Sequence, residues 1–247
     1  MSPRILVVDV ETSPHLLWGF GLFKQDFSLV QIEQPSRMIT WAAKWSGESK
    51  VFFGAEWKSD DWLVKLHELL SEADAVCHYN GRSFDMPIIS NAFREHGLPQ
   101  TSPMLRQIDL LKTVRKFRLA SSKLDWAGTV FLDQNKLSHS GFKLWKDVMH
   151  GDERAQRLME RYNRQDVVLT DKLLLEIRPF VKEYPSEQLH SEDVIKGDSC
   201  NRCGSTDLER RGYAYTDTSK YQQFRCRGCG AWSRSTRRVA AIDIKGV

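Results

Sequence analysis

The sequence predicts an α/β protein, in which helices flank a mixed β-sheet, followed by a small second module built on cysteine. Three observations support this prediction. Apolar runs typical of buried strands come early in the chain, a long amphipathic helix ends the first part, and four of the five cysteines lie near the C-terminus. Strands that alternate with helices are typical of a sheet covered by helices on its faces.

The first part of the chain carries signals for several strands and helices. Short runs of β-formers predict the strands, and apolar residues repeated every three or four positions predict the helices. The expected strands are residues 5–10, 38–44, 51–54 and 75–79, with a shorter one near 107–110. The expected helices are residues 60–72, 87–96, 110–117, 123–132 and 153–178. The hydroxyl of Ser59 is expected to cap the first helix.

Two acids, Asp9 and Glu11, stand at the end of the first predicted strand. Side chains alternate along a strand, so these two carboxylates project from the same face. Two neighbouring acids repel each other and are costly to bury, and a hard divalent cation such as Mg²⁺ removes that cost. The sequence therefore predicts a metal site here, with an acidic face turned to solvent as the alternative.

Two further acids, Asp85 and Asp166, could have either a catalytic or a purely structural role. Asp85 follows an Asn-Gly turn at the point where a strand gives way to a helix, so it is either a functional acid or a helix N-cap. Asp166 interrupts the apolar stripe of the long helix, one turn after Tyr162 on the same face. An unpaired carboxylate on a core-facing stripe is expensive. A metal shared with Asp9 would explain Asp166, and a helix edge facing solvent is the alternative.

Together these acids form three short motifs in a fixed order, namely Asp9-x-Glu11, Asn80-x-x-x-Phe84-Asp85 and Tyr162-x-x-x-Asp166. This order resembles the three exonuclease motifs of the DEDD 3′→5′ exonucleases, in the subgroup with tyrosine in the third motif. The histidine subgroup would carry histidine where this chain has Arg161. The resemblance covers about residues 4–180 and extends to stand-alone exonucleases of bacteriophages and bacteria. It implies a ribonuclease H-like fold.

The resemblance also implies an activity and roles for single residues. The chain would hydrolyse terminal phosphodiesters of mainly single-stranded DNA and release nucleoside 5′-monophosphates. Two Mg²⁺ or Mn²⁺ ions would be held by the four acids, Asp9, Glu11, Asp85 and Asp166. Tyr162 would orient the attacking water, since a phenol with a pKa of about 10 is a poor base at neutral pH. Substrate contacts are assigned to Asn80, Phe84, Thr12 and Lys143.

The tail predicts a second metal site of a different kind. Cys200-x-x-Cys203 and Cys226-x-x-Cys229 are separated by 22 residues, and a glycine follows each pair. Four thiolates satisfy tetrahedral Zn²⁺ and close its coordination, so one structural zinc ion in a zinc ribbon is expected. Disulfides are the weaker alternative, because the start of the chain does not read as a secretory signal.

The tail is also basic and aromatic. Residues 198–247 hold ten Lys and Arg residues against five Asp and Glu residues, which favours contact with phosphate. Its aromatic residues could stack on bases or could fill the small core, and the core use is favoured for most of them. They are Tyr213, Tyr215, Tyr221, Phe224 and Trp232. The aromatic segment 18–27 leaves the same two uses open, a wedge against a terminal base or core filling.

The remaining predictions concern domain boundaries, cellular location and partners. Three regions are expected: a catalytic domain over residues 1–180, a linker over 181–197 and a zinc ribbon over 198–247. No apolar stretch approaches the length of a membrane span, so we expect a cytoplasmic protein with no membrane partner. The expected partner is nucleic acid, with DNA favoured over RNA, and a replication or recombination protein is a candidate second partner.

Two alternatives to DNA exonuclease activity stay open at this point. The same catalytic core could trim RNA or cut structured DNA, because contacts to the ribose 2′-hydroxyl are not readable from sequence. A catalytically silent fold could instead serve as a nucleic-acid-binding or replisome-binding adaptor. The complete set of four acids and a tyrosine argues against the silent fold.

Overall fold

The computed structural model describes residues 3–21, 23, 25–137, 140–190 and 199–243. The chain divides into two compact units, one built from residues 4–175 and the other mainly from residue 176 onward. Within the described residues, no helix is long and apolar enough to cross a membrane.

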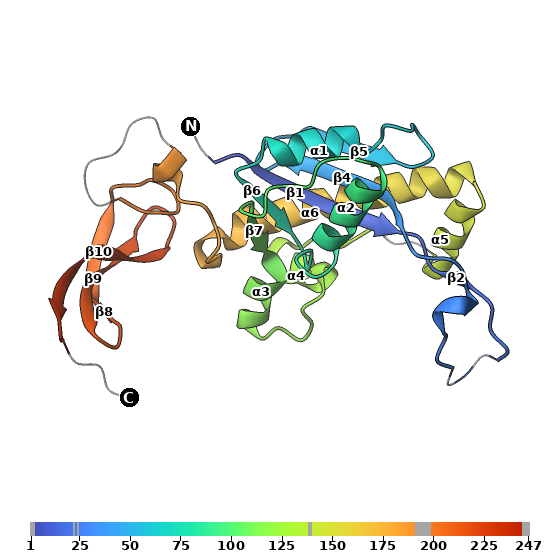
Figure 1. The fold of residues 1–247 in the computed structure, drawn as a ribbon. Helices are drawn as coiled ribbons and strands as arrows, with labels where there is room; N and C mark the ends of the chain where they lie inside the picture. The colour runs from blue at the N-terminus through green and yellow to red at the C-terminus, as the bar shows by residue number, and fades with distance from the viewer. Residues whose placement is uncertain (1–2, 22, 24, 138–139, 191–198, 244–247) are drawn as a thin grey trace. The chain divides into compact units, whose positions relative to one another are not determined.

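A five-stranded mixed sheet forms the centre of the larger unit, and Figure 1 shows helices packed around it. In spatial order the strands are β5 (Val51–Ala55), β4 (Met38–Trp45), β1 (Ile5–Thr12), β6 (Ala75–His78) and β7 (Arg106–Asp109). The central strand β1 runs antiparallel to β4 and parallel to β6. Its acids therefore project from the middle of the sheet rather than from an edge.

Six α-helices of the described chain accompany the sheet. They are α1 (Val64–Ser71), α2 (Asp85–Glu95), α3 (Leu110–Val114), α4 (Leu124–Leu132), α5 (Phe142–Met149) and α6 (Glu153–Ile177). Single 3₁₀ turns cover Leu29–Gln31, Arg115–Phe117, Arg178–Phe180 and Glu187–His190. A two-stranded ribbon pairs β2 (Leu16–Leu17) with β3 (Ile32–Gln34).

The two faces of β1 contact different helices. Leu6, Val8 and Val10 share one apolar core cluster with residues of α1 and α2. On the other side, Ile39 of β4 packs with residues of α5 and α6, Tyr162 among them. Because side chains alternate, Asp9 and Glu11 project away from the α1–α2 core and toward the face that α6 covers. The predicted alternation of β1 is therefore confirmed.

Helices α1 and α5 differ from the prediction for identifiable reasons. Helix α1 begins at Val64, because residues 60–63 form turns and the Ser59 hydroxyl bonds to the side chain of Asp61. Helix α5 was not expected in a stretch rich in serine and glycine. It has only two turns, and burial of Leu144 and Val148 stabilises it.

The aromatic segment after β1 is turned outward. Trp18 is 72 % exposed, and Phe20 and Phe23 are more exposed still. Core filling is therefore the wrong interpretation for these three rings, and the alternative, a wedge against a terminal base, stays a prediction.

A buried ion pair joins the sheet to α6. The Lys44 ammonium of β4 bonds to the Asp171 carboxylate, whose other oxygen accepts a hydrogen bond of 2.7 Å from the Ser46 hydroxyl. Both charged residues are buried. The pair thus satisfies polar groups that would otherwise be costly in this part of the core.

Removing one partner of this pair should destabilise the protein strongly. Asp171→Ala would leave a buried, uncompensated ammonium, and the expected loss is about 3–5 kcal/mol in the free energy of unfolding. Urea denaturation followed by circular dichroism measures it. Glu153→Ala, which breaks an exposed pair on the same helix, should cost below about 1 kcal/mol. Equal losses in both variants would show that the buried pair has no special role.

The smaller unit contains a three-stranded antiparallel sheet in the order β10-β9-β8. Its strands are β8 (Leu208–Tyr215), β9 (Ser219–Cys226) and β10 (Trp232–Ala241). Cysteine pairs stand before β8 and at the turn between β9 and β10. The predicted α/β class, with a mixed sheet, flanking helices and a small cysteine-based module, is therefore confirmed. Residues 191–197 of the predicted linker, and residue 198 of the predicted zinc ribbon, lie outside the described part of the chain.

Candidate active site and metal centres

Three of the four predicted acids converge beside the sheet. Asp9 and Glu11 come from β1 and Asp166 comes from α6, and each offers a carboxylate oxygen within 4.8 Å of the others. Asp166 is buried, and Asp9 and Glu11 are partly buried. The carboxylates therefore lie close enough to share a cation, and hard cations prefer such oxygen ligands.

Asp85 approaches the same group from the start of α2. Its Oδ1 accepts a hydrogen bond of 3.0 Å from the backbone N–H of Val10, and its side chain is buried. A side chain at Gly81 would place a Cβ 2.7 Å from Asp85 Oδ2, so the glycine is needed for this approach. The N-cap alternative is wrong, because the cap position of α2 is Phe84 and the Asp85 carboxylate bonds to β1 instead.

Burial and mutual repulsion shift the acids toward their protonated forms. Burial, and then the charges of Asp85, Glu11 and Asp166, raise the pKa of Asp9 well above its ordinary value. Burial and the charge of Asp166 raise the pKa of Glu11 to about 8. Burial raises the pKa of Asp85 to about 7, against the hydrogen bond from Val10. Such a group of acids can ionise fully at neutral pH only when a positive charge lies among them.

The protein without divalent ions should therefore lose stability as the pH rises. A carboxyl group whose folded pKa is raised stabilises the fold at low pH, and this contribution disappears as the pH rises through the folded pKa. For Glu11 that window runs from 4.5 to about 8. We expect the melting temperature to fall by several degrees across it, and Mn²⁺ to restore most of the loss at pH 8. Glu11→Gln should flatten the profile. An unchanged melting curve across this window would contradict the assignment.

A lysine that the sequence analysis missed lies at the acidic group. Lys136 Nζ is 2.5 Å from Asp166 Oδ2 and 2.9 Å from the hydroxyl oxygen of Tyr162. Burial alone would lower the pKa of Lys136, but the charge of Asp166 and the hydrogen bonds to Asp166 and Tyr162 raise it. The lysine therefore stays charged and partly neutralises the acids. It follows α4 in an irregular segment, where no periodic pattern marks it.

Loss of the Lys136 charge should destabilise the metal-free protein and strengthen its response to metal. Lys136→Met removes a counter-charge that is partly exposed, so we expect a loss of up to about 3 kcal/mol, the lower limit for a buried pair. Thermal melts with and without Mn²⁺ should show a larger metal-induced shift in the variant than in the wild type. Lys143→Met, at an exposed lysine paired with Asp147, is the control and should change little. An equal metal-induced shift in wild type and Lys136→Met would contradict this role.

Tyr162 places its hydroxyl beside the acids. Its ring is buried and packs edge-on against Trp145, with centroids 6.2 Å apart. Burial, and then the charge of Asp166, raise the pKa of Tyr162 above its ordinary value. The raised pKa favours the protonated phenol at neutral pH, so the hydroxyl is suited to hydrogen bonding rather than to taking up a proton.

Asn163 is a second residue that the sequence analysis missed. It is fully buried, and its Nδ2 donates a hydrogen bond of 2.7 Å to Asp9 Oδ2. Its Oδ1 accepts one of 3.1 Å from the Thr40 hydroxyl. Asn163 therefore fixes the carboxylate of Asp9 relative to α6. Its spacing of three residues from Asp166 was an available signal, because both positions lie on the same side of the helix.

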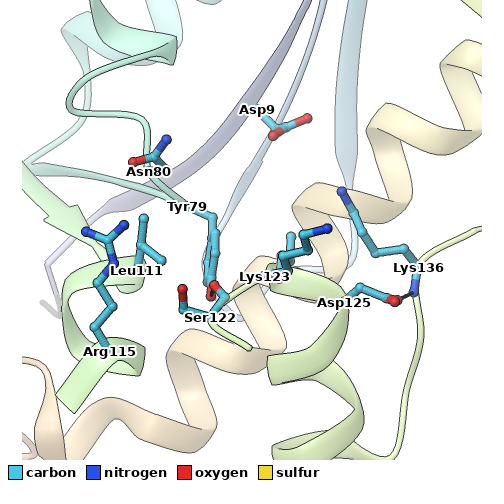
Figure 2. A pocket seen from close by; sticks show the side chains of 10 residues that line it. Asp9, Tyr79, Asn80, Leu111, Arg115, Ser122, Lys123, Asp125 and Lys136 are labelled. Carbon is cyan, nitrogen blue, oxygen red and sulfur yellow. Dashed lines mark hydrogen bonds between the residues drawn. The ribbon is translucent and has the colours of Figure 1, made fainter. Parts of the chain in front are cut away.

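A cavity of about 420 Å³ opens beside Asp9. Figure 2 shows Asp9 above Arg115 and Lys123, with the Lys136 side chain beside it, and Asp125 also lines this cavity. The hydroxyl of Tyr79 donates to the backbone oxygen of Ser122 at 2.5 Å and closes the lower wall. A cavity in which a carboxylate of the acidic group lies near lysine and arginine side chains can admit a phosphate beside a bound metal ion.

Comparison with known families agrees with this arrangement. The model of the RNase H superfamily matches residues 39–177, which is more than half of the chain. The chain belongs to the RNase H superfamily. The matched region includes Asp85, Tyr162 and Asp166 and begins after Asp9 and Glu11. No curated protein matches the chain.

Membership of the RNase H superfamily confirms the ribonuclease H-like fold and suggests a nuclease-type activity on nucleic acid. RNase H-like nucleases usually use divalent metals, and the three converging carboxylates are compatible with that use. The residues present fit a divalent metal ion, because the site offers several carboxylate oxygens and carries an excess of negative charge.

The four residues assigned to substrate contact lie in different places. Thr12 follows a break in the register of β1, and with Phe84 it lines a second cavity of about 230 Å³. Asn80 lines the first cavity in a left-handed conformation, with its N–H 2.9 Å from Asp109 Oδ1. Lys143 projects from α5 and pairs with Asp147. Its contact with substrate stays a prediction.

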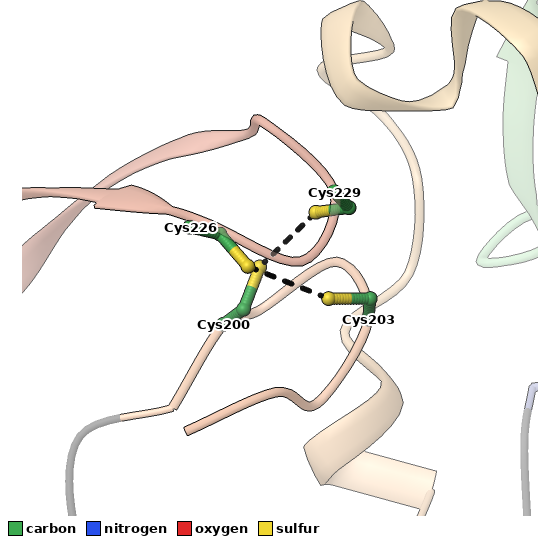
Figure 3. Close-up of side chains that lie close together, drawn as sticks. All are labelled: Cys200, Cys203, Cys226 and Cys229. Carbon is green, nitrogen blue, oxygen red and sulfur yellow. Dashed lines mark hydrogen bonds between the residues drawn. The ribbon is translucent and has the colours of Figure 1, made fainter. Parts of the chain in front are cut away.

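The four cysteines of the tail form a compact cluster in the smaller unit, as Figure 3 shows. Cys200 Sγ lies 3.7 Å from Cys229 Sγ, and Cys203 Sγ lies 3.6 Å from Cys226 Sγ. Tetrahedral zinc with Zn–S bonds of about 2.3 Å requires sulfurs separated by about 3.8 Å. The cluster therefore fits one zinc ion. The disulfide alternative does not hold in this structure, because all four thiols are free.

Proposed function

We propose that the chain is a metal-dependent 3′→5′ exonuclease, which hydrolyses terminal phosphodiesters of mainly single-stranded DNA and releases nucleoside 5′-monophosphates. The observation that carries this proposal is the convergence of Asp9, Glu11 and Asp166, with Asp85 bonded to the same strand. Asp9 also lines a cavity together with Arg115, Lys123 and Lys136. RNase H superfamily membership supports phosphodiester hydrolysis as the reaction class.

The four acids are the groups that would hold divalent ions in this proposal. Bound ions would lower the pKa of the attacking water and stabilise the departing 3′ oxygen. Asn163 holds the Asp9 carboxylate in place, and the Val10 N–H holds that of Asp85. Because Tyr162 keeps its proton, its role is to orient the attacking water by hydrogen bonding. Arg115 and Lys123 stand where backbone phosphates of the substrate would enter.

Degradation of end-labelled oligonucleotides tests the proposal. DNA single strands labelled at the 5′ end should yield a ladder of shortening products, and strands labelled at the 3′ end should release labelled mononucleotide at once. Both reactions should require Mg²⁺ or Mn²⁺ and stop with EDTA. Matched RNA and duplex substrates decide between DNA exonuclease, RNA trimming and cleavage of structured DNA. Cleavage at internal positions, or shortening from the 5′ end, would refute the proposal.

A further inference from the structure

The register of the small sheet sorts its side chains onto two faces. Residues directly opposite each other in an antiparallel pair project from the same face. Trp232 pairs with Arg225, Arg234 with Gln223, and Arg238 with Tyr221. Arg225, Gln223 and Tyr221 are two residues apart along β9, so all these side chains share one face, here called the Trp232 face.

The opposite face carries a different set. Tyr213 pairs with Gln222 and Tyr215 with Lys220, so these residues project from the other side, here called the Tyr215 face. Contacts between cations and rings agree with this sorting. The Arg234 guanidinium lies 3.8 Å from the ring centre of Tyr221, and the Lys220 ammonium lies 3.8 Å from that of Tyr213.

Most of the aromatic side chains on the strands of this unit lie outside its hydrophobic core. Trp232 is 52 % exposed and Tyr215 is 69 % exposed, whereas Phe224 is buried. The sequence-based preference for core use is therefore wrong for Trp232, Tyr213 and Tyr215. The cysteine cluster with Ala231 forms the buried centre instead, so the strands need few apolar side chains to fold. The half-exposed indole of Trp232 is therefore accessible to a binding partner.

The charges of the Trp232 face favour an anionic partner. At the paired positions of the described strands this face carries Arg225, Arg234 and Arg238, all exposed. Its acid is Glu209, opposite Arg225, and that carboxylate already lies 3.0 Å from the Arg211 guanidinium. Planar guanidinium groups beside aromatic rings match a chain that alternates phosphates with flat bases.

We propose that the Trp232 face binds single-stranded nucleic acid, with a base stacked on Trp232 and phosphates paired with Arg225, Arg234 and Arg238. A single strand fits better than a duplex, because a base must leave its own stack to lie on an exposed indole. This binding site is separate from the acidic group of the larger unit and requires no hydrolysis, so it goes beyond the proposed function. It would raise the local concentration of substrate for the catalytic unit.

Fluorescence anisotropy of the full chain with labelled 30-nucleotide oligo-dT tests the site. The buffer should contain no added Mg²⁺ or Mn²⁺ and no chelator, so that cleavage stops while zinc stays bound. Trp232→Ala should weaken binding about tenfold, the effect of losing one stacked base. The pair Arg234→Gln and Arg238→Gln should lower the salt dependence of log K by about 1.4, since each phosphate contact on a single strand contributes about 0.7.

Matched variants on the Tyr215 face serve as controls. Tyr215→Ala and Arg210→Gln remove a more exposed ring and an exposed cation, and they should change affinity less than about twofold. Trp232→Phe should retain most of the affinity, because it keeps a ring. One zinc per chain and an unchanged melting curve would show that each variant is folded.

Two results would overturn the proposal. One is unchanged affinity and salt dependence in both Trp232-face variants when zinc content is intact. The other is an equal loss in the Tyr215-face controls, which would indicate general charge attraction. Oligo-U in place of oligo-dT distinguishes RNA from DNA, and tighter binding of duplex than of single strands would contradict the stacking geometry. Loss of hydrolysis with intact binding would refute only the exonuclease proposal.

Discussion

Asp166→Asn is expected to lower the rate of 3′-end hydrolysis by about three orders of magnitude or more, as removal of a single catalytic group does in other enzymes. The change preserves shape but removes one of three carboxylates that lie within 4.8 Å of one another, so the site loses a ligand and a charge. Asp9→Ala should have the same effect. Single-turnover degradation of a labelled oligonucleotide at saturating Mg²⁺ and at saturating Mn²⁺ measures the loss.

Folding and binding should survive these changes. Asp166→Asn removes the ion pair with Lys136, but it also relieves repulsion among the acids, so the melting temperature should stay close to that of the wild type. Glu153→Gln, at an exposed position of the same helix, is the control and should keep full activity. Near-normal turnover in either Asp166→Asn or Asp9→Ala would refute the metal assignment, even if the protein proves to be a nuclease.

Cys226→Ser should remove one zinc ion per chain and unfold the small unit. Binding of a structural zinc contributes about 10–16 kcal/mol in comparable peptides, more than so small a sheet could replace by packing. Zinc content by atomic absorption and near-ultraviolet circular dichroism measure the two effects. Cys77→Ala, at a buried cysteine of β6 outside the cluster, should keep its zinc.

The catalytic unit should remain active in Cys226→Ser, because its sheet and acidic group come from residues 4–175. We expect weaker but measurable digestion, with the largest loss on long single strands. Complete loss of activity on short oligonucleotides would show that the small unit belongs to the active fold. Full zinc content in the variant would contradict the four-cysteine site.

Sequence patterns predicted the parts of the site that regular elements position. The period of a strand placed Asp9 and Glu11 on one face, and the period of a helix placed Tyr162 one turn from Asp166. Lys136 could not be found this way, because it reaches the acids from an irregular segment whose path depends on tertiary packing. The role of Asp85 as a cap or a site residue was undecided for the same reason, since only the fold brings it to the N–H of Val10.

In the tail, the sequence predicted the metal cluster but not the orientation of the aromatic side chains. Cysteine spacing predicted the metal cluster, because two thiolates separated by two residues can always reach one ion. The orientation of the aromatic rings depended on strand register, which shifts between Arg210 and Tyr213 in β8 and twice in β10, between Arg234 and Arg238 and between Arg238 and Ala240. A shift of one residue turns every following side chain to the other face, so no sequence pattern could assign Trp232 to a face.

Anomalous diffraction from crystals grown with Mn²⁺ is the decisive test of the metal site. We expect a manganese peak within coordination distance of carboxylate oxygens from Asp9, Glu11 and Asp166, with the Lys136 ammonium displaced from Asp166. Occupied metal at the cysteine cluster, with no manganese at these three carboxylates, would contradict it.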